Sequence, residues 1–330
     1  MKKPKILILF CGGTISMAKN KEGALVGHYT ADQLFKIEPR VKELADLDVE
    51  VVTDVDSTNM DRGHWEKLVD LVVKNYSNYD GFLVTCGTNT MAYASSALSF
   101  ALKDIGKPVV FTGAQIPAEV INTDAHNNFV NALRVAMMDI AGVFVVFGSK
   151  IILGCRAKKV NESELEAFDV FNDTPFGEIM IKIRINRKNY NHRHNKKLVA
   201  KNGFNDDIIC LTLIPGLRSE HLIKLIDDKI KGVVLRAFGS GDVPYELFSA
   251  LEYARKKKVP VLVTTQCPRG ATVMGINEPG RRALELGVIQ VFDMSMEAMS
   301  TKLMWAIKQG IPYEKMKKFI QTNFVGEIKE

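Results

Sequence analysis

Apolar runs alternate with amphipathic segments along the first half of the chain. Buried strands are predicted by the apolar runs at residues 6–10, 49–55, 81–85, 108–112 and 142–148, and helices by the apolar spacing of residues 62–76, 92–102 and 125–138. A regular alternation of strands and helices favours a parallel sheet with helices on both faces. We therefore predict a larger α/β domain in residues 1–185.

A basic and polar segment at residues 186–205 interrupts the alternation, and we interpret it as a linker. It contains His192 and His194, which we predict to be solvated because a third metal ligand is missing beside them. The alternation then resumes with strands predicted at 208–213, 232–236 and 259–265 and helices at 219–228 and 244–254. Residues 206–330 are therefore expected to form a second, smaller α/β domain.

A glycine turn directly after the first predicted strand is the first candidate for chemistry. Gly12 and Gly13 let the backbone turn sharply and approach a ligand, and Thr14 follows them. Ligands of α/β proteins bind at the carboxyl ends of the strands, and a hydroxyl placed there is a candidate nucleophile. Taken alone, Gly-Gly-Thr is more typical of a simple tight turn.

Two further strand ends carry hydroxyl and amide groups. They contribute Ser57, Thr58 and Asn59 after the second predicted strand, and Thr88, Asn89 and Thr90 after the third. In a parallel sheet these groups reach the same edge as Thr14. A hydroxyl nucleophile also needs a base, and Lys159, just beyond the apolar run 151–153, can supply one, although a lysine at a strand end is usually solvated.

Composition restricts the classes of function. The net charge of +6 lies mostly in short lysine runs without interleaved aromatic residues, so we expect no nucleic-acid partner. The five cysteines are far apart and form no CxxC pair, which argues against a disulfide framework or a structural zinc and fits a reducing cytoplasm. The first apolar run is too short for a signal peptide, and no run of apolar residues is long enough to span a membrane, so we expect a soluble cytoplasmic protein.

Several blocks together resemble the L-asparaginase family, in particular its type I, cytoplasmic bacterial members. The segment ILFCGGTI at 8–15 resembles the first threonine motif, usually TGGTI, and CGTNTM at 86–91 resembles the second, usually HGTDTM. Further blocks resemble family segments in order along nearly the whole chain: DSTNM at 56–60, GAQIP at 113–117, GCRAKK at 154–159, TQC at 265–267 and EAMSTKL at 297–303.

This resemblance implies an asparaginase-like fold and hydrolysis of the side-chain amide of L-asparagine to aspartate and ammonia. It implies Thr14 as the nucleophile, Thr88 and Lys159 as the activating pair, and neither a metal nor an organic cofactor. The implied substrate-binding residues are Ser57, Thr58, Asn59 and Asn89. It also implies a homo-oligomer, dimer or tetramer, which the Met- and Ala-rich helix predicted at 294–307 favours, and a possible effector site at Arg236, Asp242 and Cys267.

Two departures from the family pattern keep other functions open. Asn89 replaces the acidic residue that binds the substrate's α-ammonium group, and Ala24 falls where the family has a tyrosine, in a polar loop, 18–30, that we predict to be a mobile lid; Tyr29 lies nearby. The chain could instead hydrolyse a substrate without a free α-ammonium group, or bind a small amide without turnover. The related subunit of the archaeal tRNA-dependent amidotransferase is not favoured, because it carries an extra domain before its first threonine motif.

Overall fold

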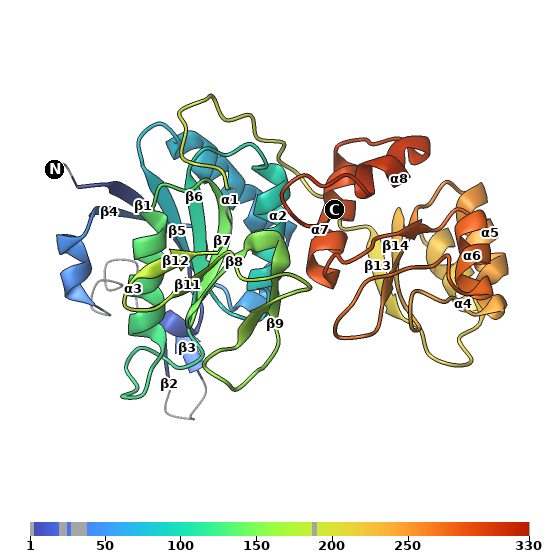
Figure 1. The fold of residues 1–330 in the computed structure, drawn as a ribbon, viewed down its shortest axis with the longest axis horizontal. Coiled ribbons are helices and arrows are strands. Elements are labelled where there is room, and N and C mark those ends of the chain that lie inside the picture. Colours follow the sequence, from blue (N-terminus) through green and yellow to red (C-terminus); the bar gives the residue numbers. More distant parts are fainter. Residues whose placement is uncertain (1–2, 20–24, 28–37, 187–189, 330) are drawn as a thin grey trace. The chain divides into compact units, whose positions relative to one another are not determined.

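The computed structural model describes residues 3–19, 25–27, 38–186 and 190–329. The chain divides into two compact units, Met1–Asn202 and Gly203–Glu330 (Figure 1). This division lies inside the segment 186–205. The described part of that segment before Gly203 has no helix or strand, and its backbone is bonded to the first unit: Ala141 donates to the Asn191 carbonyl (2.8 Å) and His194 to the Gly106 carbonyl (2.9 Å).

The first unit is built on an eight-stranded sheet. Its spatial order is β12 (Ile183–Ile185), β11 (Gly177–Ile179), β8 (Lys150–Leu153), β7 (Gly142–Phe147), β6 (Pro108–Thr112), β5 (Gly81–Cys86), β1 (Lys5–Cys11) and β4 (Asp46–Val51). The five strands from β7 to β4 are parallel, whereas β8, β11 and β12 are antiparallel to their neighbours. The predicted parallel sheet is therefore confirmed for five strands, and three antiparallel strands extend it at one side. Only Gly148 and Ser149 separate β7 from β8, and such a short link permits only an antiparallel pair.

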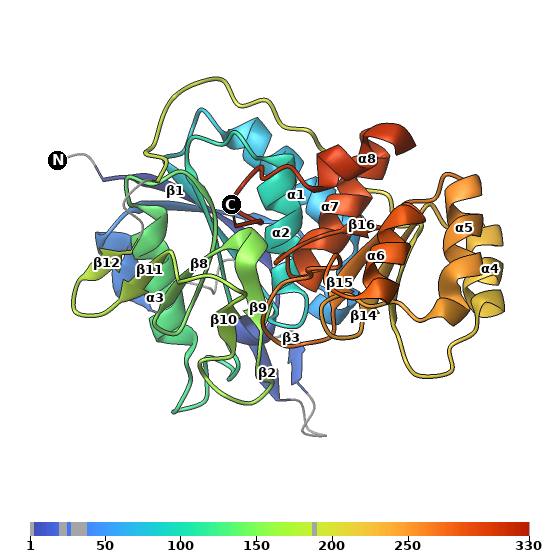
Figure 2. The ribbon, with the colours of Figure 1, turned by 45° about the vertical axis from the view of Figure 1, so that its right-hand side comes forward.

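Helices cover both faces of this sheet. Alternate residues of β1, namely Ile6, Ile8 and Phe10, pack in one cluster with Phe129 of α3 (Ala125–Ala136). The residues between them face the opposite side, where α1 (Arg62–Asn75) and α2 (Met91–Ala101) lie (Figures 1 and 2). The apolar spacing that predicts this helix is confirmed, because four residues of α1 are buried, namely Trp65, Leu68, Val69 and Val72.

The segment after β1 differs from the loop expected at 18–30. Its described residues form two short antiparallel strands, β2 (Met17–Lys19) and β3 (Leu25–Gly27). Ala24, Tyr29 and the helix predicted at 30–37 lie outside the described residues. A second two-stranded sheet pairs β9 (Ala157–Lys159) with β10 (Phe168–Val170) and ends at Lys159.

The second unit contains a four-stranded parallel sheet. Its strands are β13 (Ile208–Thr212), β14 (Gly232–Ala237), β15 (Val261–Thr265) and β16 (Ile289–Gln290), and its helices are α4 (Ser219–Asp227), α5 (Phe248–Lys256), α6 (Glu278–Glu285), α7 (Met296–Lys308) and α8 (Tyr313–Ile320). One apolar cluster joins the sheet to α4, α5 and α6, and another joins it to α7 and α8. Nine consecutive residues of α7, from 298 to 306, are buried, so this helix does not offer the surplus apolar surface expected from its sequence.

Among the described helices, none combines the length and the apolar character that crossing a bilayer requires.

Candidate active site

Close backbone contacts hold three strand ends together at one edge of the large sheet. A Cβ atom built on Gly13 would lie 2.3 Å from the amide nitrogen of Gly87, and one built on Gly87 would lie 2.4 Å from Oγ of Ser57. Gly13 also has φ +92°, a conformation that glycine adopts without strain. The turns after β1, β5 and β4 therefore touch, and they bring Thr14, Thr88 and Ser57 to the same edge, as the sequence predicts.

A lysine joins this edge through two side-chain hydrogen bonds. Lys159 Nζ donates to Oγ1 of Thr88 at 2.8 Å and to Oδ1 of Asn89 at 3.0 Å. The side-chain Nδ2 of Asn89 in turn donates to Oγ1 of Thr58 at 3.1 Å. Both ends of the Asn89 amide are thus occupied within the site. Lys159 is not a solvated lysine at a strand end but part of a connected polar network.

The surroundings of Lys159 make its ammonium group easier to deprotonate. Burial lowers the pKa of the Lys159 ammonium group below its usual value of 10.5, and the Glu162 carboxylate opposes this only in part. A carboxylate at position 89 would have held the proton on the lysine, whereas the Asn89 amide carries no charge. A lysine of lowered pKa next to a hydroxyl is able to accept a proton from it.

Helix α2 positions the segment that leads to Lys159. Two of its buried serines, Ser95 and Ser96, donate to the carbonyl of Gly154 at 2.9 and 3.2 Å. A Cβ atom on Gly154 would lie 2.7 Å from Oγ of Ser99. The small side chains of α2 therefore let the backbone at Gly154 come close to the helix, five residues before Lys159.

Gln115 also belongs to the site, although it is not among the residues predicted from the sequence. Its Oε1 accepts a hydrogen bond from Thr88 Oγ1 at 3.0 Å, and its Nε2 donates to the Glu162 carbonyl at 2.8 Å. The Asp124 carboxylate fixes this turn by accepting from the backbone N–H of Gln115 at 3.0 Å. Its position in the sequence could have indicated this role, because Gln115 follows the carboxyl end of β6 just as Thr88 follows that of β5.

Residues 57–59 form a single helical turn at the same edge. The Asp56 side chain caps the turn by accepting from the Thr58 N–H at 2.7 Å, and Thr90 Oγ1 donates to the Ser57 carbonyl at 2.6 Å. Ser57 is buried, whereas Thr58 and Asn59 are exposed. The turn therefore presents hydroxyl and amide groups next to Asn89.

The two cysteines beside the glycine turns are shielded from solvent. Cys11 and Cys86 are register partners on β1 and β5, and both are fully buried. Burial raises the pKa of both thiols, to about 12 for Cys86. A protonated, buried thiol is a poor nucleophile, so neither side chain is a competitor for Thr14.

The three residues of the possible effector site lie at the carboxyl ends of β14 and β15. Arg236 Nη2 reaches the carbonyl of Gln266, next to Cys267, at 3.5 Å. Asp242 accepts from Asn277 Nδ2 at 2.6 Å, while its Oδ1 is buried with no hydrogen-bond partner in the described part of the chain. Cys267 is exposed.

The histidines at 192 and 194 have defined surroundings. His192 Nδ1 lies 2.8 Å from Asp139 Oδ2. His194 is not the solvated residue that the sequence suggests: its ring packs against Gly106, and its Nδ1 is buried. Within the ranges that the structure describes, no group of three His, Cys, Asp or Glu side chains is arranged to hold a metal ion.

Comparison with family models covers nearly the whole chain. Residues 5–191 match the model "Asparaginase, N-terminal", and residues 207–320 match "Glutaminase/Asparaginase C-terminal domain". Among curated proteins, an L-asparaginase from Thermococcus kodakarensis is 33% identical, over 98% of this chain and 99% of its own length. A glutamyl-tRNA(Gln) amidotransferase subunit from Pyrococcus abyssi is 32% identical, over 98% of this chain and 77% of its own length.

Solved structures give the same result. The thermostable L-asparaginase from Thermococcus kodakarensis superposes with a TM-score of 0.92 at 33% identity, over 99% of both chains. L-asparaginase I from Vibrio cholerae superposes with a TM-score of 0.90 at 30% identity, over 99% of this chain and all of that one. Both units therefore have the folds of these enzymes.

Proposed function

Because this chain belongs to the asparaginase family and is an amidohydrolase of asparagine-type amides, we propose that Thr14 is its nucleophile. The Thr14 hydroxyl attacks the side-chain carbonyl of the substrate, ammonia leaves, and an ester to Thr14 remains. Water then cleaves the ester, which releases the acid and restores the threonine. Backbone N–H groups near Thr88 stabilise the oxyanion in both steps.

The observation that carries this proposal is the 2.8 Å contact between Lys159 Nζ and Thr88 Oγ1. In its neutral form, Lys159 takes a proton from Thr88 while Thr88 takes one from the attacking water. Ser57, with Thr58 and Asn59, binds the α-carboxylate end of the substrate. The direct test is ammonia release from L-asparagine, D-asparagine, L-glutamine and N-acylated asparagine. If none of these amides releases ammonia, the site is one that binds a small amide without turnover.

A second candidate differs only in its substrate, and Asn89 is the observation that favours it. An amide cannot give the α-ammonium group the charge-assisted hydrogen bond that a carboxylate gives. In addition, Oδ1 of Asn89 already accepts from Lys159 and its Nδ2 donates to Thr58. Faster release of ammonia from N-acylated asparagine than from L-asparagine would establish this second candidate.

Replacing Asn89 by aspartate is expected to raise kcat/KM for L-asparagine by about tenfold or more, equivalent to about 1.4 kcal/mol of charge-assisted binding. The same variant should gain nothing with N-acylated asparagine, which has no cation to bind. A carboxylate 3.0 Å from the lysine would also raise the pKa of Lys159. Since catalysis needs the neutral amine, the rise of kcat with pH should move to higher pH. If asparagine turnover falls or stays unchanged while the wild type is already fast, another group binds the amine.

We also propose that the protein self-associates as a dimer or tetramer, as the family resemblance implies. Ile121 and Ile181 of the first unit are fully exposed, at 103% and 98%, and a partner subunit would remove them from water. Light scattering at micromolar concentration measures the mass directly. A monomer mass would refute the proposal.

An effector site for asparagine at Arg236, Asp242 and Cys267 is proposed on the same resemblance. Arg236 supplies the cation that a carboxylate ligand needs, and Cys267 lies one residue beyond the backbone group that Arg236 contacts. We expect a sigmoidal dependence of rate on asparagine that becomes hyperbolic in Arg236→Ala. A hyperbolic curve in the wild type, unchanged in the variant, would remove this proposal.

We further propose a cytoplasmic location, because the five cysteines are far apart in the sequence and form no CxxC pair, as is typical of proteins of a reducing compartment. Fractionation of the source cells tests this.

A further inference from the structure

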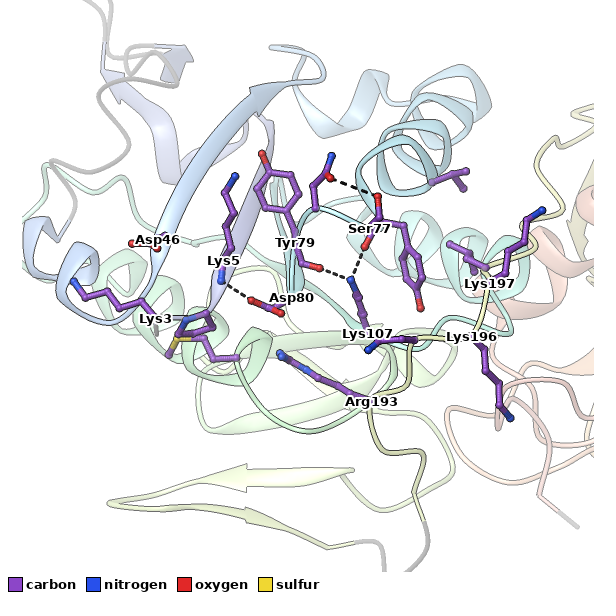
Figure 3. A pocket seen from close by; sticks show the side chains of 17 residues that line it. Lys3, Lys5, Asp46, Ser77, Tyr79, Asp80, Lys107, Arg193, Lys196 and Lys197 are labelled. Carbon is purple, nitrogen blue, oxygen red and sulfur yellow. Dashed lines mark hydrogen bonds between the residues drawn. The ribbon is translucent and has the colours of Figure 1, made fainter. Parts of the chain in front are cut away.

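A hollow of about 1190 Å³ opens at the edge of the large sheet opposite to the candidate active site. Lys5 begins β1, Asp80 precedes β5 and Lys107 precedes β6, so the hollow lies at the amino ends of these parallel strands. The segment after Arg193 runs along it, as Figure 3 shows. This site is separate from the groups around Thr88, which follow the carboxyl ends of the same strands.

Positive charge is concentrated around this hollow. Its lining contains two carboxylates, Asp46 and Asp80, and six basic side chains: Lys3, Lys5, Lys107, Arg193, Lys196 and Lys197. The lining residues carry an excess of four positive charges, of which that of Lys5 is paired with Asp48 at 3.1 Å, against a net charge of +6 for the whole chain. A concave surface of one sign raises the local concentration of the opposite ion.

Several of these basic groups are held in place by the fold. The backbone N–H of Arg193 donates to Oδ1 of Asp139 at 3.0 Å, and its side-chain Nη2 donates to the Ala136 carbonyl at 2.7 Å. Lys107 is buried, and its Nζ donates to the carbonyls of Tyr76 and Tyr79. Arg193 Nε is buried and has no acceptor among the residues described. A buried donor of this kind is stabilised when a ligand oxygen reaches it.

The aromatic residues of the hollow are already engaged. The ring of Tyr76 lies 4.7 Å from Lys107 Nζ, and its hydroxyl accepts from the Gly106 N–H at 2.9 Å. The ring of Tyr79 lies 4.7 Å from Lys5 Nζ, and its hydroxyl donates to Asp48 at 2.9 Å. One face of each ring is therefore already occupied by a lysine, which favours a ligand that is recognised by its charge.

We propose that this hollow binds a small polyanion with several linked phosphate groups, either as free triphosphate or as the triphosphate part of a nucleotide. The guanidinium group of Arg193 suits phosphate oxygens, and the exposed side chains of Lys196 and Lys197 add positive charge on the segment that follows it. The concave form of the site, at the end of a sheet, favours a compact ligand over a long strand of nucleic acid.

The test is calorimetric titration of the full chain at low salt with inorganic tripolyphosphate, ATP and orthophosphate. We expect tripolyphosphate and ATP to bind with similar affinity, and orthophosphate to bind at least about tenfold more weakly because it makes fewer charged contacts. The variants Lys196→Ala/Lys197→Ala and Arg193→Gln should each weaken tripolyphosphate binding about tenfold. The matched control is Lys317→Ala/Lys318→Ala, which removes the same charge from exposed positions of α8 and should bind as the wild type does.

Three results would overturn the proposal. The first is no binding of tripolyphosphate at low salt. The second is equal loss in the Lys317→Ala/Lys318→Ala control, which would mean that the ligand responds only to the overall charge. The third is an RNA oligonucleotide that displaces tripolyphosphate and binds at least about tenfold more tightly, which would make the hollow a nucleic-acid surface.

Discussion

Thr14→Ala is expected to lower kcat for every amide that the wild type hydrolyses by about 10⁴-fold or more, because no acyl-enzyme forms without the nucleophile. The residual rate would come from groups that bind and polarise the substrate. Ammonia release under saturating substrate measures the effect. Thr14→Ser retains a hydroxyl at the same place and should keep measurable turnover, which separates loss of the nucleophile from loss of the fold.

Trapping the intermediate gives a second readout. The ester to Thr14 adds the mass of the acyl group to the wild-type chain, and rapid acid quenching followed by mass spectrometry locates it. The adduct should be absent in Thr14→Ala. If Thr14→Ala retains wild-type turnover, the threonine mechanism is wrong. An adduct on Thr88 would instead identify that residue as the nucleophile.

Glu327→Gln is expected to lower the free energy of unfolding of the second unit by about 3–5 kcal/mol, because it leaves a buried ammonium without its counter-ion. Lys302 and Glu327 are both fully buried, with Nζ and Oε1 2.6 Å apart. Lys302 also donates to the carbonyls of Ile320 and Thr322, and Glu327 accepts from the N–H groups of Phe324 and Val325. The pair therefore connects α7 to the chain beyond α8.

Fluorescence of Trp305 reports this unfolding, because Trp305 is buried and packs against Phe324 at a ring distance of 5.9 Å. Trp65 is the only other tryptophan, so Trp65→Phe gives a background that reports the second unit alone. The control is Glu314→Gln. This variant breaks the ion pair between Glu314 and Lys258, which has a similar N–O distance of 3.0 Å but is largely exposed to solvent. Its cost should stay within about 1 kcal/mol. Equal urea midpoints for both variants would contradict the prediction.

The fold was largely predictable because apolar runs and glycine turns act locally. The predicted strand at 108–112 coincides with β6, and the four inner residues of α1 are those that its spacing indicates. The periodicity does not indicate the direction in which β8, β11 and β12 pair. The strands β11 and β12 have only three residues each, and periodicity in so few residues does not distinguish a strand from a loop.

The candidate site was predictable for a different reason. Parallel strands bring their carboxyl ends to one edge, so hydroxyl groups after separate strands had to meet. Gln115 was missed because an amide after a strand has no chemical signature until its partner is known, and that partner, Thr88, lies 27 positions away. The lowered pKa of Lys159 was equally out of reach, since it depends on burial by segments remote in sequence.

The contacts of Gly13 with Gly87, and of Gly87 with Ser57, limit how this enzyme can be altered. At these two glycines even one added methyl group collides with the neighbouring turn. We therefore expect substitutions at both positions to be rejected in natural and in laboratory evolution. Thr58, Asn59 and Asn89, by contrast, are exposed and can change size or charge without moving those turns. A library aimed at new amide substrates therefore belongs at these three positions, because diversity placed at the glycines would mostly return unfolded chains.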